Sequence, residues 1–199
     1  MLDECFRITV ESMNDDFDTL AKTAVVAGAL ARLRTLAGLD SGMERHCLRV
    51  LHIAGHIAGD RSWSVDGEVL TVAAILHDIG LYDAASRGVY TADGALFARE
   101  MLSSHGWPQA RVELCANAIE RHHELRRQLR YGAEVEAIRL ADRVDLSNGM
   151  LSAGLDRYWL RALTQEIPRV GLVKELTWLI GRMMRRRPGS LLGIFRRPS

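Results

Sequence analysis

The sequence predicts an all-α fold, and two patterns support a single helical bundle. Apolar residues recur at helical spacing along nearly the whole chain of 199 residues, and no stretch alternates apolar and polar residues as strands do. Hydrophobic residues make up 48% of the chain and charged residues 26%, which is typical of globular rather than disordered proteins. A mass of 22.2 kDa suits one core and excludes two full catalytic domains.

Three helices are expected in the first part of the chain. An Ala-rich segment over 17–36 forms the first helix. Ser41 is followed three residues later by Glu44, a capping box that predicts the start of a second helix over 41–58. The third helix, over 68–78, is apolar on nearly every side, so we expect it at the centre of the core.

The rest of the chain is predicted to continue as helices separated by short loops. Helices are expected over 92–104, 109–130 and 133–147. Further helices interrupted near Pro168 follow, and the last of them ends in a cluster of arginines. One domain with four parts results: an N-terminal helical extension (1–40), a core (41–150), C-terminal helices (151–187) and a basic flexible tail (188–199).

The distribution of charge argues against an extended nucleic-acid interface. The net charge is +1, and six arginines between residues 182 and 197 lie in a stretch without acids, so the rest of the chain carries −5. An acidic body does not provide the basic groove that a phosphate backbone requires, and we expect a small-molecule partner instead. The last helix, with Trp178 and Met183, fits either the core or the face of a homodimer.

Cysteine content and the N-terminal segment predict a cytoplasmic protein. Cys5, Cys47 and Cys115 are odd in number and widely spaced, which fits neither a disulfide framework nor a cysteine zinc site and indicates a reducing compartment. The N-terminus is acidic and lacks the basic and apolar segments of a signal peptide. The longest apolar run, Val69 to Leu76, is too short to span a membrane.

Helical geometry separates two groups of polar residues on the predicted helix over 41–58. At about 100° per residue, Val50 and Ile57 lie within about 40° of His46, so this imidazole should face the core. The other polar residues gather on a separate face that we expect to be solvated: Arg45, Arg49, His52 and His56. The two histidines on that face are therefore poor candidates for ligands.

A histidine and an aspartate end the apolar helix over 68–78. At this C-terminal position the helix dipole disfavours the carboxylate of Asp78, and the interior disfavours an unpaired charge. His77 precedes it and shares the apolar surroundings. We therefore expect a positive group to compensate Asp78.

Two more ionisable groups are predicted to point inward from later helices. His122 shares a stripe with Cys115 and Ile119, whereas His123 lies about 100° away and nearer the polar edge. Asp142 lies on the apolar face of its own helix. A second carboxylate is thus directed at the core.

Together these groups predict a site for a divalent metal ion. Carboxylates and imidazoles in one core supply the oxygen and nitrogen ligands that such an ion prefers. Each histidine alone would fit a hydrogen-bonded core position, and Asp142 alone could pair with Arg139 or Arg143. Inward ionisable groups on four helices, two of them adjacent at the end of one helix, favour a shared ion over these separate explanations.

Four segments carry a resemblance to a known family: ERHCLRVLHIAGHIA, AAILHDIG, AIERHHE and RLADRVDLSNG. In this order they resemble the HD-domain superfamily of metal-dependent phosphohydrolases, over about Ser41 to Gly149. The resemblance implies an HD-domain-like helical bundle with extra N- and C-terminal helices. It also implies the metal ligands: His46, His77, Asp78 and Asp142.

The resemblance further implies the chemistry at this site. One divalent ion per chain is expected (Mn, Fe, Zn, Mg, Co or Ni), because His105 lies in a loop and His123 points away, which leaves no further histidine for a binuclear site. Asp78 would orient the attacking water, and His122 would donate a proton to the leaving oxygen or bind phosphate. Four residues would contact a phosphorylated substrate: Arg45, Arg49, His123 and Arg143.

The implied activity is hydrolysis of a phosphomonoester or phosphodiester, such as a nucleotide. After the His-Asp pair the chain reads IGLY, unlike the stringent-response hydrolases, and it lacks the GYP element of cyclic-di-GMP phosphodiesterases. Two alternatives stay open. One is a hydratase or iron oxygenase acting on a non-phosphate small molecule, and the other is a degenerate HD domain that serves as a regulatory or scaffold module.

Overall fold

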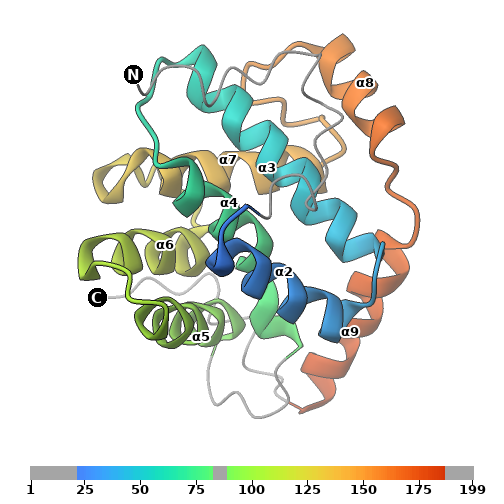
Figure 1. The fold of residues 1–199 in the computed structure, drawn as a ribbon. Helices are drawn as coiled ribbons and strands as arrows, with labels where there is room; N and C mark the ends of the chain where they lie inside the picture. The colour runs from blue at the N-terminus through green and yellow to red at the C-terminus, as the bar shows by residue number, and fades with distance from the viewer. Residues whose placement is uncertain (1–21, 83–88, 187–199) are drawn as a thin grey trace.

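The structure is an all-α bundle, as predicted, and its described parts contain no β-strand (Figure 1). The computed structural model describes residues 22–82 and 89–186. In these two ranges the short 3-10 helices η2 (Ile79–Leu81) and η3 (Leu129–Tyr131) lie between the longer ones. The α-helices in these ranges are α2 (Ala24–Ala37), α3 (Gly42–Asp60), α4 (Gly67–Leu76), α5 (Tyr90–Ser104), α6 (Gln109–Arg121), α7 (Ala133–Leu146), α8 (Arg157–Glu166) and α9 (Leu172–Arg186).

Helix α4 lies at the centre of the bundle, as its apolar sequence predicts. Figure 1 shows neighbouring helices around it, and it contacts α2, α3, α6 and α7. Asp66 starts the helix by accepting hydrogen bonds from two backbone N–H groups of the first turn, and the residues from Val69 to Leu76 are all buried. A helix enclosed on every side fixes the position of the residues that follow its last turn, here His77 and Asp78.

Helix α3 begins after the predicted capping residue, but only half of the capping box forms. The Ser41 hydroxyl accepts a hydrogen bond from the backbone N–H of Glu44 at 3.0 Å. The Glu44 carboxylate accepts instead from the backbone N–H of Asp40 and from the guanidinium of Arg34, both at 2.8 Å. Glu44 therefore ties the start of α3 to the end of α2.

Helix α6 ends at Arg121 and does not continue to residue 130 as predicted. Tertiary hydrogen bonds hold the turn that follows it, because the guanidinium groups of Arg139 and Arg143 each donate to the carbonyl oxygen of Glu124 at 3.1 Å. Both arginines belong to α7. These contacts outweigh the helical propensity of the segment and turn the chain at the edge of the core.

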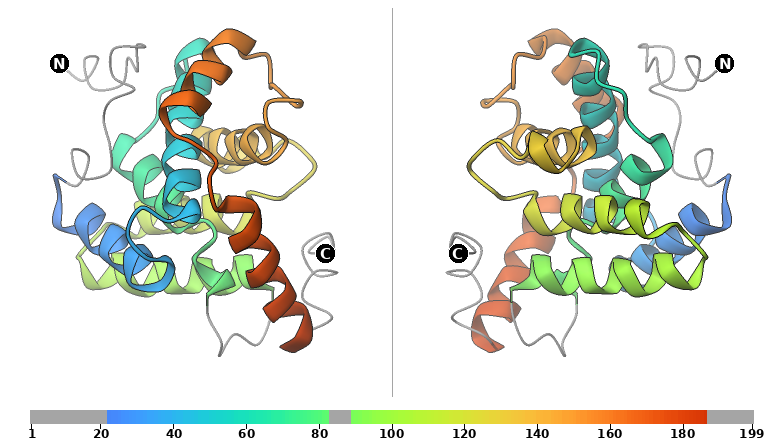
Figure 2. Two further views of the ribbon diagram at one scale, coloured as in Figure 1. Left: turned by 90° about the vertical axis from the view of Figure 1, so that its right-hand side faces the viewer. Right: turned by 90° about the vertical axis from the view of Figure 1, so that its left-hand side faces the viewer.

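Two helices that follow α7 pack along α3. Figure 2 shows α8 and α9 at opposite ends of this helix, and the sequence between them contains Pro168, as predicted. Helix α9 contacts both α3 and η2. Cys47 and Cys115 are buried free thiols. No helix in the described ranges is long and apolar enough to cross a membrane.

Some predictions fall outside the described residues. The predicted first helix begins at residue 17, whereas the described chain begins at residue 22 and α2 begins after Thr23. The predicted basic tail over 188–199 and Cys5 also lie outside the described ranges. The division of the chain into four parts therefore stays a prediction.

Close packing after α4 gives the first testable prediction. A Cβ atom at Gly80 would lie 2.0 Å from the carbonyl oxygen of Tyr90 and 2.9 Å from the backbone nitrogen of Gly94. Gly80→Ala should lower the free energy of unfolding by about 1 to 3 kcal/mol, because backbone atoms of α5 cannot move aside without repacking the core. Urea denaturation followed by circular dichroism measures this change.

Gly59→Ala is the matched control for this substitution. A Cβ atom at Gly59 would meet nothing within 4 Å, so the added methyl should leave stability unchanged or raise it by about 0.5 to 1 kcal/mol. An equal loss of stability in both variants would show that close packing at Gly80 is not the cause.

Candidate metal centre

Ionisable side chains from four helices and the turns after them meet at one point inside the core. They are His46 from α3, His77 and Asp78 after α4, His122 and His123 after α6, and Asp142 from α7. All of them except His123 are at most 5% exposed. The inward orientation predicted for His46, His122 and Asp142 is therefore confirmed.

His46, His77 and Asp142 form the first of two ligand groups. The Nε2 atoms of His46 and His77 lie 3.1 Å apart. Oδ1 of Asp142 lies 3.4 Å from Nε2 of His46 and 3.8 Å from Nε2 of His77. These separations suit three ligand atoms around one ion that binds each of them at about 2 Å.

Each of the three buried histidines of this cluster has one ring nitrogen engaged by an acceptor. Nδ1 of His77 and Nδ1 of His122 donate to the carbonyl oxygens three residues earlier, at 2.9 and 2.6 Å. Nδ1 of His46 donates to Oδ2 of Asp145 at 2.7 Å. These bonds leave the Nε2 lone pairs of all three rings directed at the cluster, where a cation or a proton can bind them.

Asp78, His122 and His123 form a second ligand group beside the first. Nε2 of His122 lies 3.5 Å from Oδ1 of Asp78, and Nδ1 of His123 lies 3.3 Å from Oδ2 of Asp142. The prediction that His123 points away from the cluster is wrong. Since α6 ends at Arg121, the helical angle between His122 and His123 does not apply, and the second ring also turns inward.

Imidazoles keep the two carboxylates ionised. Burial alone would raise the pKa of Asp78, but His77 and His122 lower it well below its usual range. The histidines around Asp142 have the same effect on its pKa. Burial in turn lowers the pKa of His77 to about 4, so this ring is neutral and available as a ligand.

Two buried oxygen atoms at the centre have no hydrogen-bond partner, Oδ1 of Asp78 and Oδ1 of Asp142. Such atoms cost about 1 to 3 kcal/mol each, so each calls for a partner. Burial disfavours a charged His46, yet Asp142 and Asp145 raise its pKa to about 10, which shows how strongly the site attracts positive charge. Nitrogen and oxygen donors without a thiolate fit a divalent metal ion.

The alternative in which an arginine neutralises Asp142 is wrong. Arg139 pairs with Glu136 at 2.7 Å, and Arg143 donates to the carbonyl oxygen of Glu124. In residues 22–82 and 89–186, the ion pairs of Asp142 are with histidines alone. The positive group that the sequence requires is therefore not a neighbouring arginine.

Comparison with known families identifies this arrangement. A family model for the HD domain matches residues 43–147, which include every residue of both ligand groups. The chain belongs to the HD domain family. Members of this family are mostly metal-dependent hydrolases. The match excludes α2, α8 and α9, so an HD domain with extra N- and C-terminal helices is confirmed. No curated protein matches the chain.

Asp145 supports the HD-domain site and escaped the sequence analysis. It accepts from His46, and Arg49 donates to it through two bonds of 2.7 and 3.0 Å, while Arg169 lies 3.1 Å from Oδ1. A carboxylate behind a metal-binding imidazole fixes its tautomer and raises its basicity. Helical spacing could have revealed it, because Asp145 follows Asp142 by three residues.

Tyr90 also reaches the HD-domain site without having been predicted. Its hydroxyl, in the first turn of α5, lies 3.4 Å from Nε2 of His122 and contacts Nε2 of His123. Burial raises the pKa of Tyr90 well above its usual value, so the phenol keeps its proton. No spacing or motif in the sequence marks this residue.

The predicted phosphate-binding arginines of α3 are engaged elsewhere. Arg49 is buried and donates to the carbonyl oxygens of Ile167 and Pro168, both at 3.1 Å. Arg45 donates to the carbonyl oxygen of Val170 at 2.8 Å. The segment between α8 and α9 covers this face of α3. The prediction that the face is solvated is therefore wrong for these two arginines.

The two histidines expected on that solvated face are also covered. His52 is 2% exposed, and the ring of His56 stacks on Trp159 of α8 with the centroids 4.1 Å apart. The prediction of solvation is therefore wrong for His52. Neither histidine belongs to the two ligand groups, in agreement with the prediction that they are not ligands.

The bond between Asp145 and His46 yields the second prediction. Asp145→Asn should weaken Mn²⁺ binding by about 10- to 100-fold, because the amide no longer draws the Nδ1 proton and the imidazole becomes a poorer ligand. Isothermal titration of the metal-free protein with Mn²⁺ measures the affinity. Asp60→Asn, which changes an exposed carboxylate on α3, should leave it unchanged. Equal affinity in the Asp145 variant and the wild type would contradict this role.

Proposed function

We propose that this protein is a metal-dependent phosphohydrolase that hydrolyses a phosphomonoester or phosphodiester of a small molecule such as a nucleotide. The observation that supports it most directly is the pair of unsatisfied carboxylate oxygens, on Asp78 and Asp142, beside three imidazole Nε2 atoms. A divalent ion held by these residues would polarise a phosphoryl oxygen and lower the pKa of water.

The ligand groups favour two neighbouring ions rather than the single ion expected from the sequence. That expectation depended on His123 pointing away, and His123 instead lies with Asp78 and His122. His46, His77 and Asp142 would hold one ion, and the other three residues would hold the second.

The residues around these groups have distinct tasks in the proposed reaction. Oδ1 of Asp78 has no partner and can accept a hydrogen bond from the attacking water. Since Nδ1 of His122 is committed to the carbonyl oxygen of Ile119 and Nε2 faces Asp78, we assign this ring as a ligand rather than as the predicted proton donor. Tyr90 keeps its proton and can donate to a phosphate oxygen at the edge of the site.

The substrate is proposed to approach from the side of His123. Its side chain is 24% exposed, whereas those of His46 and His77 are fully buried. Arg45 and Arg49 are engaged elsewhere, so a phosphate group would meet its main positive charge at the metal ions that His46, His77, Asp142 and the second group would hold. A site with one accessible edge suits a small phosphoester better than a polymer.

Phosphate ester hydrolysis tests the proposed activity. The Mn²⁺-loaded protein should hydrolyse p-nitrophenyl phosphate or bis(p-nitrophenyl) phosphate, and EDTA should abolish the activity until Mn²⁺ is restored. Asp78→Asn should reduce turnover by at least about 100-fold, because it removes both a ligand and the acceptor for water. Release of p-nitrophenol is measured, with Asp60→Asn as the control.

Other outcomes of this assay would replace the proposal. A metal-loaded protein without activity on a wider panel of phosphoesters would favour the hydratase or oxygenase alternative. A protein that binds no metal would favour a regulatory or scaffold role.

Metal content tests the number of ions independently of activity. Elemental analysis of protein saturated with Mn²⁺ should give two ions per chain for the wild type and one for His123→Ala, because this substitution removes a ligand from the second group only. His56→Ala is the matched control and should retain two. A wild-type content of one ion would restore the expectation drawn from the sequence.

A further inference from the structure

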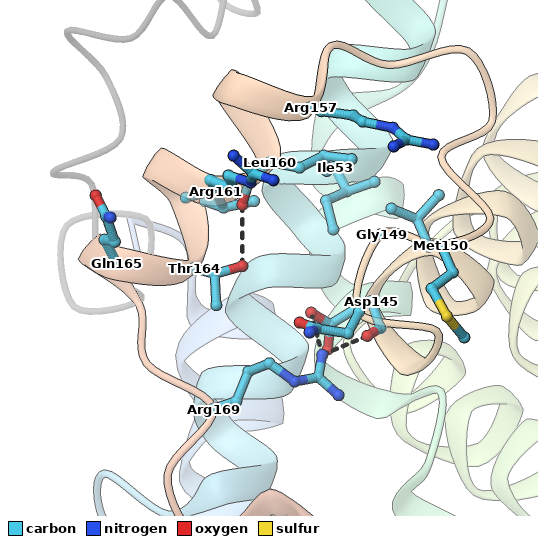
Figure 3. Close-up of a pocket in the computed structure, with 13 residues that line it drawn as sticks. Ile53, Asp145, Gly149, Met150, Arg157, Leu160, Arg161, Thr164, Gln165 and Arg169 are labelled. Carbon is cyan, nitrogen blue, oxygen red and sulfur yellow. Dashed lines mark hydrogen bonds and ion pairs between the residues drawn. The ribbon is translucent and has the colours of Figure 1, made fainter.

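A cavity of about 550 Å³ lies beside Asp145, between helix α8 and the end of α7 (Figure 3). Helix α8, the end of α7 and the loop between them form most of its wall. This volume falls in the range of small-molecule sites. The HD-domain chemistry does not use the cavity.

The lining of the cavity is strongly basic. Arg157, Arg161 and Arg169 line it together with one acid, Asp145. Figure 3 shows Arg157 and Arg161 projecting from α8, and Arg169 at the opposite end beside Asp145. Since Asp145 is already bound by Arg49 and His46, it does not neutralise the arginines of α8.

The two arginines of α8 that line the cavity have guanidinium groups available to bind a ligand. Arg157 and Arg161 are exposed, and neither guanidinium group forms an ion pair or hydrogen bond with a residue in the described parts of the chain. Four residues apart on one helix, they lie about one turn from each other and can act on one ligand. Two free guanidinium groups match a dianion, and their planar donors suit the oxygens of phosphate.

An apolar wall adjoins these charges. Ile53 of α3 and Leu160 of α8 line the cavity, and Met150 extends over its other side, as Figure 3 shows. Apolar side chains with a few polar groups at one end are typical of sites for organic anions rather than for bare inorganic ions.

The cavity is separate from the metal centre, although the two share a wall. Asp145 lines the cavity and its Oδ2 accepts from Nδ1 of His46, the ring nitrogen opposite the one that faces the metal ligands. A ligand in the cavity would thus lie behind the imidazole and could not reach the ligand groups.

We propose that this cavity binds a small organic phosphate, with its dianionic group on Arg157 and Arg161 and its apolar part against Ile53, Leu160 and Met150. The proposal does not depend on the phosphohydrolase activity. It rests on the cavity, the two uncommitted guanidinium groups and the adjoining apolar wall.

Phenylphosphonate is the probe for this site, because its carbon–phosphorus bond withstands phosphoester hydrolysis. Isothermal titration of the full chain in EDTA, which keeps the metal centre from contributing, should show saturable binding of one molecule per chain. Inorganic phosphate should bind at least about tenfold more weakly, because it lacks the apolar part.

Charge-matched variants locate the binding. Arg157→Gln with Arg161→Gln should weaken phenylphosphonate binding by at least about tenfold. Arg185→Gln with Arg186→Gln removes the same charge from exposed positions of α9 and should change the affinity by less than about twofold. Since all four side chains are exposed, these variants should fold, which circular dichroism checks.

Three results would overturn the proposal. They are the absence of saturable binding to the wild type, unchanged binding to the Arg157 and Arg161 variant, and equal weakening in both double variants. The last result would reveal attraction by net charge alone.

Discussion

Burial of carboxylates among imidazoles is the constraint on which the structure depends. Asp78 and Asp142 are at most 5% exposed, and the ion pairs described for them are with histidines. An unpaired ionised group in a protein interior is far more costly than one in water. The core around α4 can therefore remain closely packed only while a positive charge lies beside these carboxylates. The same need for positive charge fixes the positions of the helices that bring the carboxylates and imidazoles together.

A second layer of hydrogen bonds connects this point to the segment between α8 and α9. Asp145 holds His46, Arg49 and Arg169 hold Asp145, and Arg49 also binds the carbonyl oxygen of Ile167. The family match ends at residue 147, so Arg169 and Ile167 lie beyond it. The segment between α8 and α9 is therefore part of the support for the candidate metal centre, and not an appendage to the HD domain.

Helical angles predicted the orientation of several site residues correctly, and they failed for one residue beyond the end of a helix. Helical angles placed His46 and Asp142 inward correctly, because both lie inside long helices. They failed for His123, because hydrogen bonds from α7 end the helix before it. No local pattern reveals such tertiary contacts.

The second kind of failure concerned polar faces. Arg49 and His52 were assigned to solvent because polar residues usually lie there, yet both are buried, and Arg49 donates to carbonyl oxygens of a segment more than a hundred residues away. Helical geometry predicts which residues share a face and does not predict what packs on it. In the sequence, only Asp145, one helical turn after Asp142, could have indicated that Arg49 has a buried partner.

The use of arginine in this protein follows from the same physics. Arg49, Arg139 and Arg143 each satisfy backbone carbonyl oxygens at turns that close the core, which the several donors of one guanidinium do well. An arginine near a metal ligand is thus no sign of a phosphate-binding site when carbonyl oxygens lie within its reach. Arg157 and Arg161 differ because they have no such acceptor among the described residues and line a cavity. An arginine is structural when its guanidinium N–H groups already bind acceptors within the protein, and it can bind a ligand when they do not. Its distance along the sequence from the His-Asp pair does not decide this.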